Sequence, residues 1–229
     1  MKTRFVSIDE ARSIAGGVGV VIDVVRAFTT TAWAFHLGAE RIVLTDDLAE
    51  ALKLKAQLPG SLALKDGEPA QGFDLTNSPV HMKVRDGMRG RTIVQRTTHG
   101  TVGAVAARGA AALYCAGFVC ASATASIIRA SGETDIWFVV TGDEGKAEED
   151  LACAELVSTL IEDPQAQPGP YVSRVEHSRA AERVTALAQS GAKGFAAGDV
   201  AMCMEVDRFD FAMRATMEDS LLVLRKVVV

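Results

Sequence analysis

Short runs of β-branched residues alternate along the chain with longer stretches in which apolar residues recur three or four positions apart. The first pattern is typical of strands buried on both faces, and the second of amphipathic helices. It predicts strands at residues 18–23, 41–44, 61–65, 92–96, 111–115 and 135–140. Helices are predicted at residues 29–37, 48–57, 101–108, 121–129 and 147–161. This alternation indicates an α/β fold with a largely parallel sheet.

A Pro-rich stretch, DPQAQPGPY at residues 163–171, interrupts the pattern. Beyond it, helices are predicted at 173–189 and 200–206, and final strands at 209–214 and 221–229. One short Pro cluster is more typical of a loop within a domain than of a linker. Because 229 residues, 48% of them hydrophobic, are enough for one large core, we predict a single domain over residues 1–229 with a loop break near 163–171.

The composition favours a small-molecule ligand. The net charge is −5, and basic and acidic residues are mixed, so we expect neither nucleic acid nor a membrane surface as partner. The four cysteines form no CxxC pair and lie in apolar stretches, which predicts reduced, packed thiols and a cytoplasmic location. No apolar stretch approaches the roughly 18 residues of a membrane helix. A homo-oligomer is left open.

Three segments share one layout, in which a strand leads through a polar turn into a helix: VVIDVVRAFTTT (20–31), TIVQRTTHGT (92–101) and IWFVVTGDEGKAEED (136–150). Because strand carboxyl ends form the ligand-binding edge of such sheets, we expect these turns to converge. They offer glycines, hydroxyls, helix-start amides and the cations Arg26 and Arg96. This set suits a phosphate or a sulfonate.

Carboxylates form the other half of the pattern, at Asp23, Glu68, Asp143, Glu144 and residues 148–150. Hard oxygen ligands of this kind hold Mg²⁺, with water and phosphate completing its shell. Two alternatives are open at this point. Asp23 either ligates metal or forms a buried ion pair with Arg26. The acids at 148–150 either ligate metal or are ordinary partners of a helix dipole.

The segment GEPAQGFDLTNSP, residues 67–79, predicts a long ordered loop that leads into a helix at Pro79, with Asn77 or Ser78 as its cap. Its polar residues Glu68, Asp74 and Asn77 are functional candidates. In the turn TTHGT, His99 is interpreted as a donor to substrate, with capping or packing as the alternative.

Together, the segments VVIDVVRAFTTT, GE followed by GFDLTNSP, TTHGT and TGDEGKAEEDLACAEL resemble the 2-phosphosulfolactate phosphatase (ComB) family over about residues 18–160. The resemblance implies a three-layer α/β/α fold with a largely parallel or mixed sheet. It also implies Mg²⁺-dependent hydrolysis of 2-phospho-3-sulfolactate to 3-sulfolactate and phosphate, a step of coenzyme M biosynthesis in methanogens. The chain departs from the usual family pattern at His99, where asparagine is usual, and at Thr76, where glycine is usual.

These considerations define a set of predicted site residues. The predicted catalytic residues are Asp23, Arg26, Glu68 and Asp150. The predicted Mg²⁺ ligands are Asp23, Glu68, Glu149 and Asp150. The predicted substrate-binding residues are Arg26, Asn77, Arg96, Thr97, Thr98, His99, Gly100 and Thr101. The alternatives are a non-catalytic anion-binding protein and a phosphatase of a different small ester.

Overall fold

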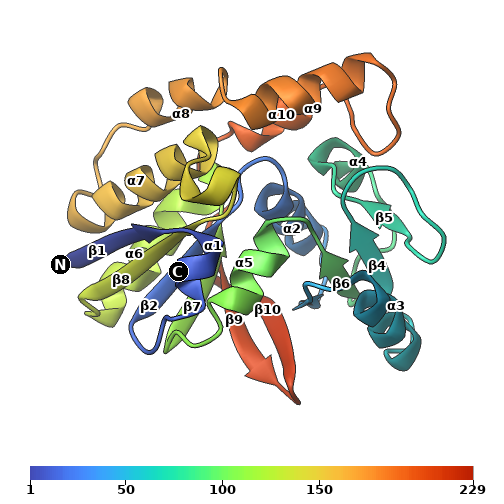
Figure 1. Cartoon of the computed structure of the whole chain (residues 1–229), viewed down its shortest axis with the longest axis horizontal. Helices are drawn as coiled ribbons and strands as arrows, with labels where there is room; N and C mark the ends of the chain where they lie inside the picture. Colours follow the sequence, from blue (N-terminus) through green and yellow to red (C-terminus); the bar gives the residue numbers. More distant parts are fainter. Residues whose placement is uncertain (229) are drawn as a thin grey trace.

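A computed structural model describes residues 1–228 and contains one mixed ten-stranded sheet with the strand order β1-β8-β2-β7-β9-β10-β3-β6-β4-β5 (Figure 1). The strands are β1 (Lys2–Val6), β2 (Val18–Ile22), β3 (Arg41–Leu44), β4 (Leu62–Lys65), β5 (Leu75–Thr76), β6 (Thr92–Arg96), β7 (Ala112–Ala116), β8 (Asp135–Val140), β9 (Phe211–Glu218) and β10 (Leu221–Val228). The predicted α/β class is confirmed.

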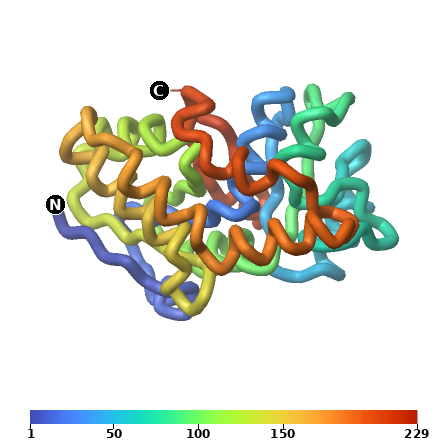
Figure 2. Tube along the Cα trace, turned by 90° about the horizontal axis from the view of Figure 1, so that it is seen from above, coloured from blue at the N-terminus to red at the C-terminus, as the bar shows by residue number. Residues whose placement is uncertain are grey.

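The α-helices are α1 (Ile8–Ala11), α2 (Ala27–His36), α3 (Leu48–Gln57), α4 (Pro79–Lys83), α5 (Gly100–Ala106), α6 (Ala121–Ser131), α7 (Glu148–Glu162), α8 (Gly169–Val175), α9 (Arg179–Gln189) and α10 (Asp199–Cys203). Two short 3-10 turns are η1 (Phe118–Cys120) and η2 (Asp143–Gly145). Helices α6 and α7 pack together, as do α1 and α5, and Figure 2 shows α6 and α1 on opposite sides of the sheet. This arrangement is compatible with a three-layer fold.

The sheet consists of two parallel halves joined by an antiparallel hairpin. Strands β1, β8, β2 and β7 run parallel to one another, and so do β3, β6, β4 and β5. Between them, β9 and β10 pair antiparallel with each other and with the strands that flank them. The strands of one half therefore run antiparallel to the strands of the other half. The sheet must twist at the hairpin for the carboxyl ends of both halves to meet. Two-stranded ribbons twist more strongly than wide sheets, which suits this role.

Helix α2 is buried along almost its whole length, which explains the polar run at its start. Thr29, Thr30 and Thr31 are all buried, and each hydroxyl donates a hydrogen bond to a backbone carbonyl four or five residues earlier. The Thr31 hydroxyl also lies 2.8 Å from Oε1 of Gln95 on β6. Since the helix carries its own partners for these hydroxyls, it can pack inside the molecule.

Three sequence-based expectations need correction. Strand β1 and helix α1 were not predicted, although β1 forms an edge of the sheet. The single helix predicted at 173–189 is two helices, because the Ser178 side chain accepts a hydrogen bond from Ala181 N and starts α9 anew. The strand predicted at 209–214 extends instead from Phe211 to Glu218. Val229, the last residue of the final predicted strand, lies outside the described residues.

The cysteines are as expected: Cys115, Cys120, Cys153 and Cys203 are free and buried. Within residues 1–228, none of the helices combines the length and apolar character required to cross a bilayer. Residues 163–168 of the predicted loop at 163–171 connect α7 to α8, whereas residues 169–171 form the start of α8.

Gly103 on α5 allows a close contact between this helix and the sheet. A Cβ atom there would lie 2.7 Å from Cγ2 of Thr141 and 2.9 Å from Cγ1 of Val21, both on short, stiff side chains. We expect Gly103→Ala to reduce the free energy of unfolding by about 1–3 kcal/mol, because overpacking forces the helix away from the sheet. Gly169→Ala is the control, since a Cβ atom at that position meets nothing within 4 Å. Urea unfolding measures both changes, and equal effects would contradict the packing argument.

Candidate functional site

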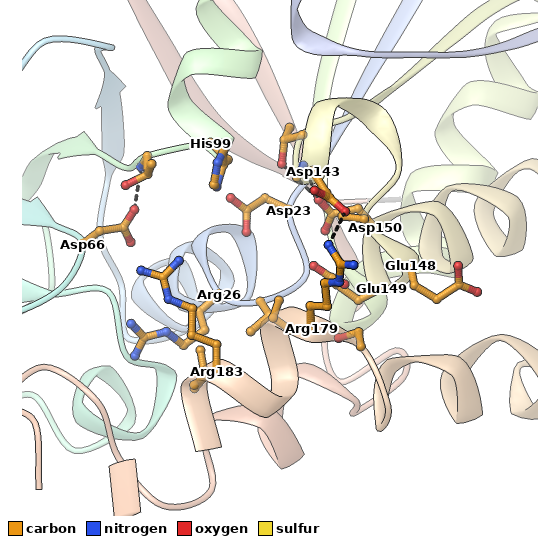
Figure 3. Close-up of a pocket in the computed structure, with 18 of the residues that line it drawn as sticks. Asp23, Arg26, Asp66, His99, Asp143, Glu148, Glu149, Asp150, Arg179 and Arg183 are labelled. Atoms are coloured by element: carbon orange, nitrogen blue, oxygen red, sulfur yellow. Dashed lines mark hydrogen bonds and ion pairs between the residues drawn. The ribbon is translucent and has the colours of Figure 1, made fainter. Parts of the chain in front are cut away.

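A cavity of about 690 Å³ lies where the carboxyl ends of the two sheet halves meet (Figure 3). Asp23 and Thr141 follow β2 and β8 of one half, whereas Asp66 and Thr98 lie beyond the ends of β4 and β6 of the other. The layer formed by α8, α9 and α10 crosses above the strand ends (Figure 1), and α9 contributes to the cavity wall. The predicted convergence of the polar turns is therefore confirmed.

Three acids from two turns form a buried cluster beside this cavity. The exposed fractions of Asp23, Glu149 and Asp150 are 7%, 5% and 3%. Asp150 Oδ1 accepts a hydrogen bond from Val24 N at 2.8 Å. Its Oδ2 accepts one from Gly142 N at 3.0 Å, and the Thr141 hydroxyl lies at 3.1 Å. Asp150 thus ties the turn after β8 to the turn after β2.

Burial and the charges of neighbouring carboxylates raise the pKa of all three carboxyls. Burial raises the pKa of Asp23 to about 7, and the negative charges of Asp66 and Glu149 add to this effect. Burial raises the pKa of Asp150 well above its ordinary value, assisted by the charges of Asp23 and Glu149. The pKa of Glu149 is also raised, mainly by burial. A cation in the cavity would offset this concentration of negative charge.

The ion pair considered for Asp23 and Arg26 is wrong, because Arg26 pairs with a different acid. Arg26 Nη1 lies 2.7 Å from Oδ2 of Asp199, at the start of α10. Asp23 instead accepts a hydrogen bond from Ala27 N at 3.1 Å and forms no ion pair within residues 1–228. The Asp23 carboxylate is therefore available to the cavity.

The turn TTHGT divides into a structural part and an exposed part. Thr97 and Thr101 are buried and hold each other, since each backbone N–H donates to the other's hydroxyl oxygen at 2.8 and 3.0 Å. Thr98 and His99 line the cavity. His99 is exposed and makes no capping hydrogen bond, so neither the capping nor the packing interpretation holds. Gly100 is required because a Cβ atom would lie 2.8 Å from Oδ2 of Asp23.

Five predicted residues lie outside the cavity lining: Glu68, Arg96, Thr97, Gly100 and Thr101. Asp66 occupies the place expected for Glu68. The Glu68 side chain is exposed, and only its backbone carbonyl is engaged, by Lys65 Nζ at 2.8 Å. Arg96 Nε is directed toward the carbonyl of Asp46 at 3.4 Å. Asp66 accepts hydrogen bonds from Asn77 Nδ2 at 2.6 Å and from Thr98 N at 2.5 Å. Asp66 directly follows strand β4, as Asp23 follows β2, and this shared position was the signal that could have identified it.

Basic side chains that line the cavity from outside the sheet were also missed. Lys146 precedes α7, and His177 precedes α9. Arg179 and Arg183 lie four residues apart on α9, a spacing that puts them on one helix face. Arg179 Nη1 lies 3.6 Å from Asp143 Oδ2, whereas Arg183 makes no ion pair with any carboxylate of residues 1–228. Figure 3 shows Arg183 beside Arg26, and Arg179 beside Asp143.

The acids at the start of α7 have separate roles. Glu148 is exposed at the helix start, and its Oε1 lies 2.5 Å from Arg174 Nε, so it behaves as an ordinary surface partner. Glu149 and Asp150 face the interior. Among the residues that the structure describes, no group of three or more His, Cys, Asp or Glu side chains converges as a ready-made metal site. Any metal would therefore need oxygen ligands from water or substrate as well.

Acids and guanidinium groups line one cavity at the strand ends of an α/β protein, at the edge where sheets of this class bind small molecules. The comparisons with known proteins narrow this class. The family model described as 2-phosphosulpholactate phosphatase matches residues 6–217, and the chain belongs to this family.

Relatives with the name "Probable 2-phosphosulfolactate phosphatase" support the assignment. The Bacillus subtilis (strain 168) protein is 29% identical over 215 residues, 93% of this chain and 92% of its own. The Carboxydothermus hydrogenoformans protein is 30% identical over 216 residues, 90% of this chain and 89% of its own. A Synechococcus (strain RCC307) protein is 38% identical over 149 residues, 62% of this chain and 60% of its own.

The raised pKa of Asp23 predicts a pH-dependent stability for the metal-free protein. The folded chain retains a proton on Asp23 that the unfolded chain releases near the ordinary pKa of 3.8, so this contribution is lost as the pH rises through about 7. In EDTA, the urea concentration at the midpoint of unfolding should decrease as the pH is raised from 5 to 8. Asp23→Asn should reduce that fall, because an amide has no proton to lose.

The control for this titration is Asp207→Asn, which changes an acid that binds Ser122 outside the cavity. It should leave the fall in midpoint as large as in the wild type. Part of the fall should persist in Asp23→Asn, since the pKa values of Glu149 and Asp150 are also raised. An unchanged fall in Asp23→Asn would show that Asp23 ionises at its ordinary pKa.

Proposed function

We propose that this protein is an Mg²⁺-dependent phosphatase that hydrolyses 2-phospho-3-sulfolactate to 3-sulfolactate and phosphate. The observation that carries the proposal is the cavity itself, in which buried carboxylates face guanidinium groups in a chain of the 2-phosphosulpholactate phosphatase family. The names of the relatives favour the same reaction and substrate.

The donor chemistry of the cavity fits Mg²⁺. Asp23, Glu149 and Asp150 would hold the ion, because their carboxylates are buried close together and form no ion pair within residues 1–228. Mg²⁺ usually binds through one or two carboxylates, with water and phosphate oxygens as further ligands, so three converging side chains are not required. When bound, the ion would act as a Lewis acid toward a phosphoryl oxygen and lower the pKa of a water molecule.

The residues of the chain would bind and orient the ester. Arg26 would stabilise charge on the phosphoryl oxygens, since its buried guanidinium lines the cavity in a fixed position. Thr98 and His99 would donate hydrogen bonds from the turn after β6. Asp150 would hold the turns after β2 and β8 next to each other through its three hydrogen bonds. No protein nucleophile is needed for attack by water.

The rest of the substrate would face α9. The cavity of about 690 Å³ exceeds what a phosphate group alone requires, and Arg183 lines it without a carboxylate partner within residues 1–228. Arg183 is therefore our candidate to bind the sulfonate, in place of Arg96, which the sequence predicted as a substrate-binding residue. Arginine suits this task because its fork of N–H donors matches the oxygens of an anion.

The direct test of the proposed function is phosphate release from a panel of esters that includes 2-phospho-3-sulfolactate, with Mg²⁺ or with EDTA. Asp23→Asn should lower kcat by at least about 100-fold, because it removes a charged group from the reaction site. Asp207→Asn should retain full activity. Asp23→Asn should also stay folded at pH 8, as checked by circular dichroism.

The same panel separates the alternatives. Metal-dependent release from a different ester, with none from 2-phospho-3-sulfolactate, would replace the proposed substrate. Anion binding without release from any ester would show a non-catalytic binding protein. Full activity in EDTA would remove Mg²⁺ from the proposal.

Arg183→Gln tests recognition of the sulfonate. The ratio of kcat/KM for 2-phospho-3-sulfolactate to that for 2-phospholactate, which lacks the sulfonate, should fall by about 10-fold or more, since a charge-assisted hydrogen bond is lost. Arg108→Gln, at an exposed arginine outside the cavity lining, should leave the ratio unchanged. An unchanged ratio in Arg183→Gln would place the sulfonate elsewhere in the cavity.

A further inference from the structure

Asp199 is a fully buried acid to which the sequence analysis assigned no role, and its exposed fraction is 0%. Its Oδ2 accepts hydrogen bonds from Arg26 Nη1 at 2.7 Å and from Ala196 N at 3.0 Å. Its Oδ1 accepts hydrogen bonds from the Ser78 hydroxyl at 2.6 Å and from Val80 N at 3.2 Å. One carboxylate therefore joins three parts of the chain: the turn after β2, the start of α4 and the segment before α10.

The Arg26 side chain is enclosed by this last segment. Its exposed fraction is 4%, and Nη1 also donates to the carbonyl oxygen of Gly194 at 2.9 Å. The Phe195 ring lies 4.3 Å from Cζ of Arg26, in the range of a cation–π contact. Residues 194–199, GFAAGD, thus supply a carbonyl, an aromatic face and a carboxylate to a single guanidinium.

This enclosure meets a physical need of the buried cation. A guanidinium removed from water needs compensation of its charge and partners for its N–H groups. Asp23, the acid nearest to it in sequence, does not form an ion pair with it. Since Arg26 has a long and flexible side chain, its direction into the cavity depends on contacts from outside the turn that carries it.

We propose that residues 194–199, through Asp199, position the Arg26 guanidinium in the cavity. Asp199 is a positioning residue, because it acts on the ligand through Arg26 and does not itself line the cavity. The inference rests on the proposed function only for its kinetic readout, since the contacts themselves do not depend on the substrate. It also gives the C-terminal helical layer a role in the chemistry at the strand ends.

A purely structural role for Asp199 is the competing interpretation, because Asp199 also fixes Ser78 and Val80 at the start of α4. The two roles use different oxygen atoms, which makes them separable. Oδ2 accepts a hydrogen bond from the Arg26 guanidinium, and Oδ1 accepts one from the Ser78 hydroxyl. Changing one partner at a time distinguishes them.

The test is a double-mutant cycle with Arg26→Gln, Asp199→Asn and the double variant, measured as kcat/KM for 2-phospho-3-sulfolactate. Asp199→Asn alone should lower kcat/KM by about 10- to 100-fold, as expected when a catalytic group is displaced. In the Arg26→Gln background, the same change should cost less than about 3-fold, because the group it positions is already absent. Losses that multiply would overturn the proposal.

Two further variants serve as references. Glu218→Gln breaks a bidentate pair with Arg225 (2.9 and 3.0 Å) on the β9–β10 hairpin, and it should change kcat/KM by less than about 2-fold. Ser78→Ala removes the hydroxyl that donates to Oδ1, and it leaves the Val80 N–H donor and the ion pair intact. It should lower the melting temperature and retain kcat/KM within about 3-fold. A loss in Ser78→Ala as large as in Asp199→Asn would support the structural interpretation.

Two measurements keep the inference testable under other outcomes. If Asp199→Asn does not fold, Phe195→Leu replaces it in the cycle, because it removes the aromatic face from Arg26 and leaves the buried carboxylate in place. If the wild type does not hydrolyse the ester, calorimetric binding of inorganic phosphate replaces kcat/KM. Weaker phosphate binding in Asp199→Asn only when Arg26 is present supports the positioning role even if the proposed function fails.

Discussion

Burial of like charges at the carboxyl ends of the strands is the constraint on which the site depends. Asp23, Glu149 and Asp150 lie where water is largely excluded, and the charges of Asp23 and Glu149 raise the pKa of Asp150 further. Backbone N–H groups compensate part of this negative charge. Those of Val24 and Gly142, for example, donate hydrogen bonds to the Asp150 carboxylate. The remaining negative charge faces the cavity, and this charge supports the proposal that a cation binds there together with an anionic ester.

Positive charge in the same cavity comes in a fixed and an adaptable form. Arg26 is buried and held by Asp199 and Gly194, so little reorganisation is needed when it meets a ligand. Arg183 lies on the exposed face of α9 without such partners within residues 1–228. In the proposed function, Arg26 would therefore meet the reacting group, and Arg183 would adjust to the remainder of the ligand.

Sequence reasoning succeeded where a local pattern carries the information. The β-branched run before Asp23 has a buried strand as its natural structure, and an acid directly after such a strand lies at the ligand-binding edge. It failed for Glu68 because two residues of turn carry that side chain outward, whereas Asp66 lies directly after its strand. It failed for Arg96 because strand residues alternate in direction, and a cation at a strand end can face either side of the sheet.

The sequence by itself determined the α/β class, nearly all strands, the buried cysteines and the acids of the first and third turns, since these follow from periodicity and from residues close together in the chain. Only the tertiary structure decided that Arg26 pairs with Asp199, 173 positions away, and that α9 contributes two arginines to the cavity. It also decided that two oppositely directed sheet halves meet at one cavity, because an antiparallel hairpin joins them. Pairing of this kind depends on long-range packing, which no local pattern encodes.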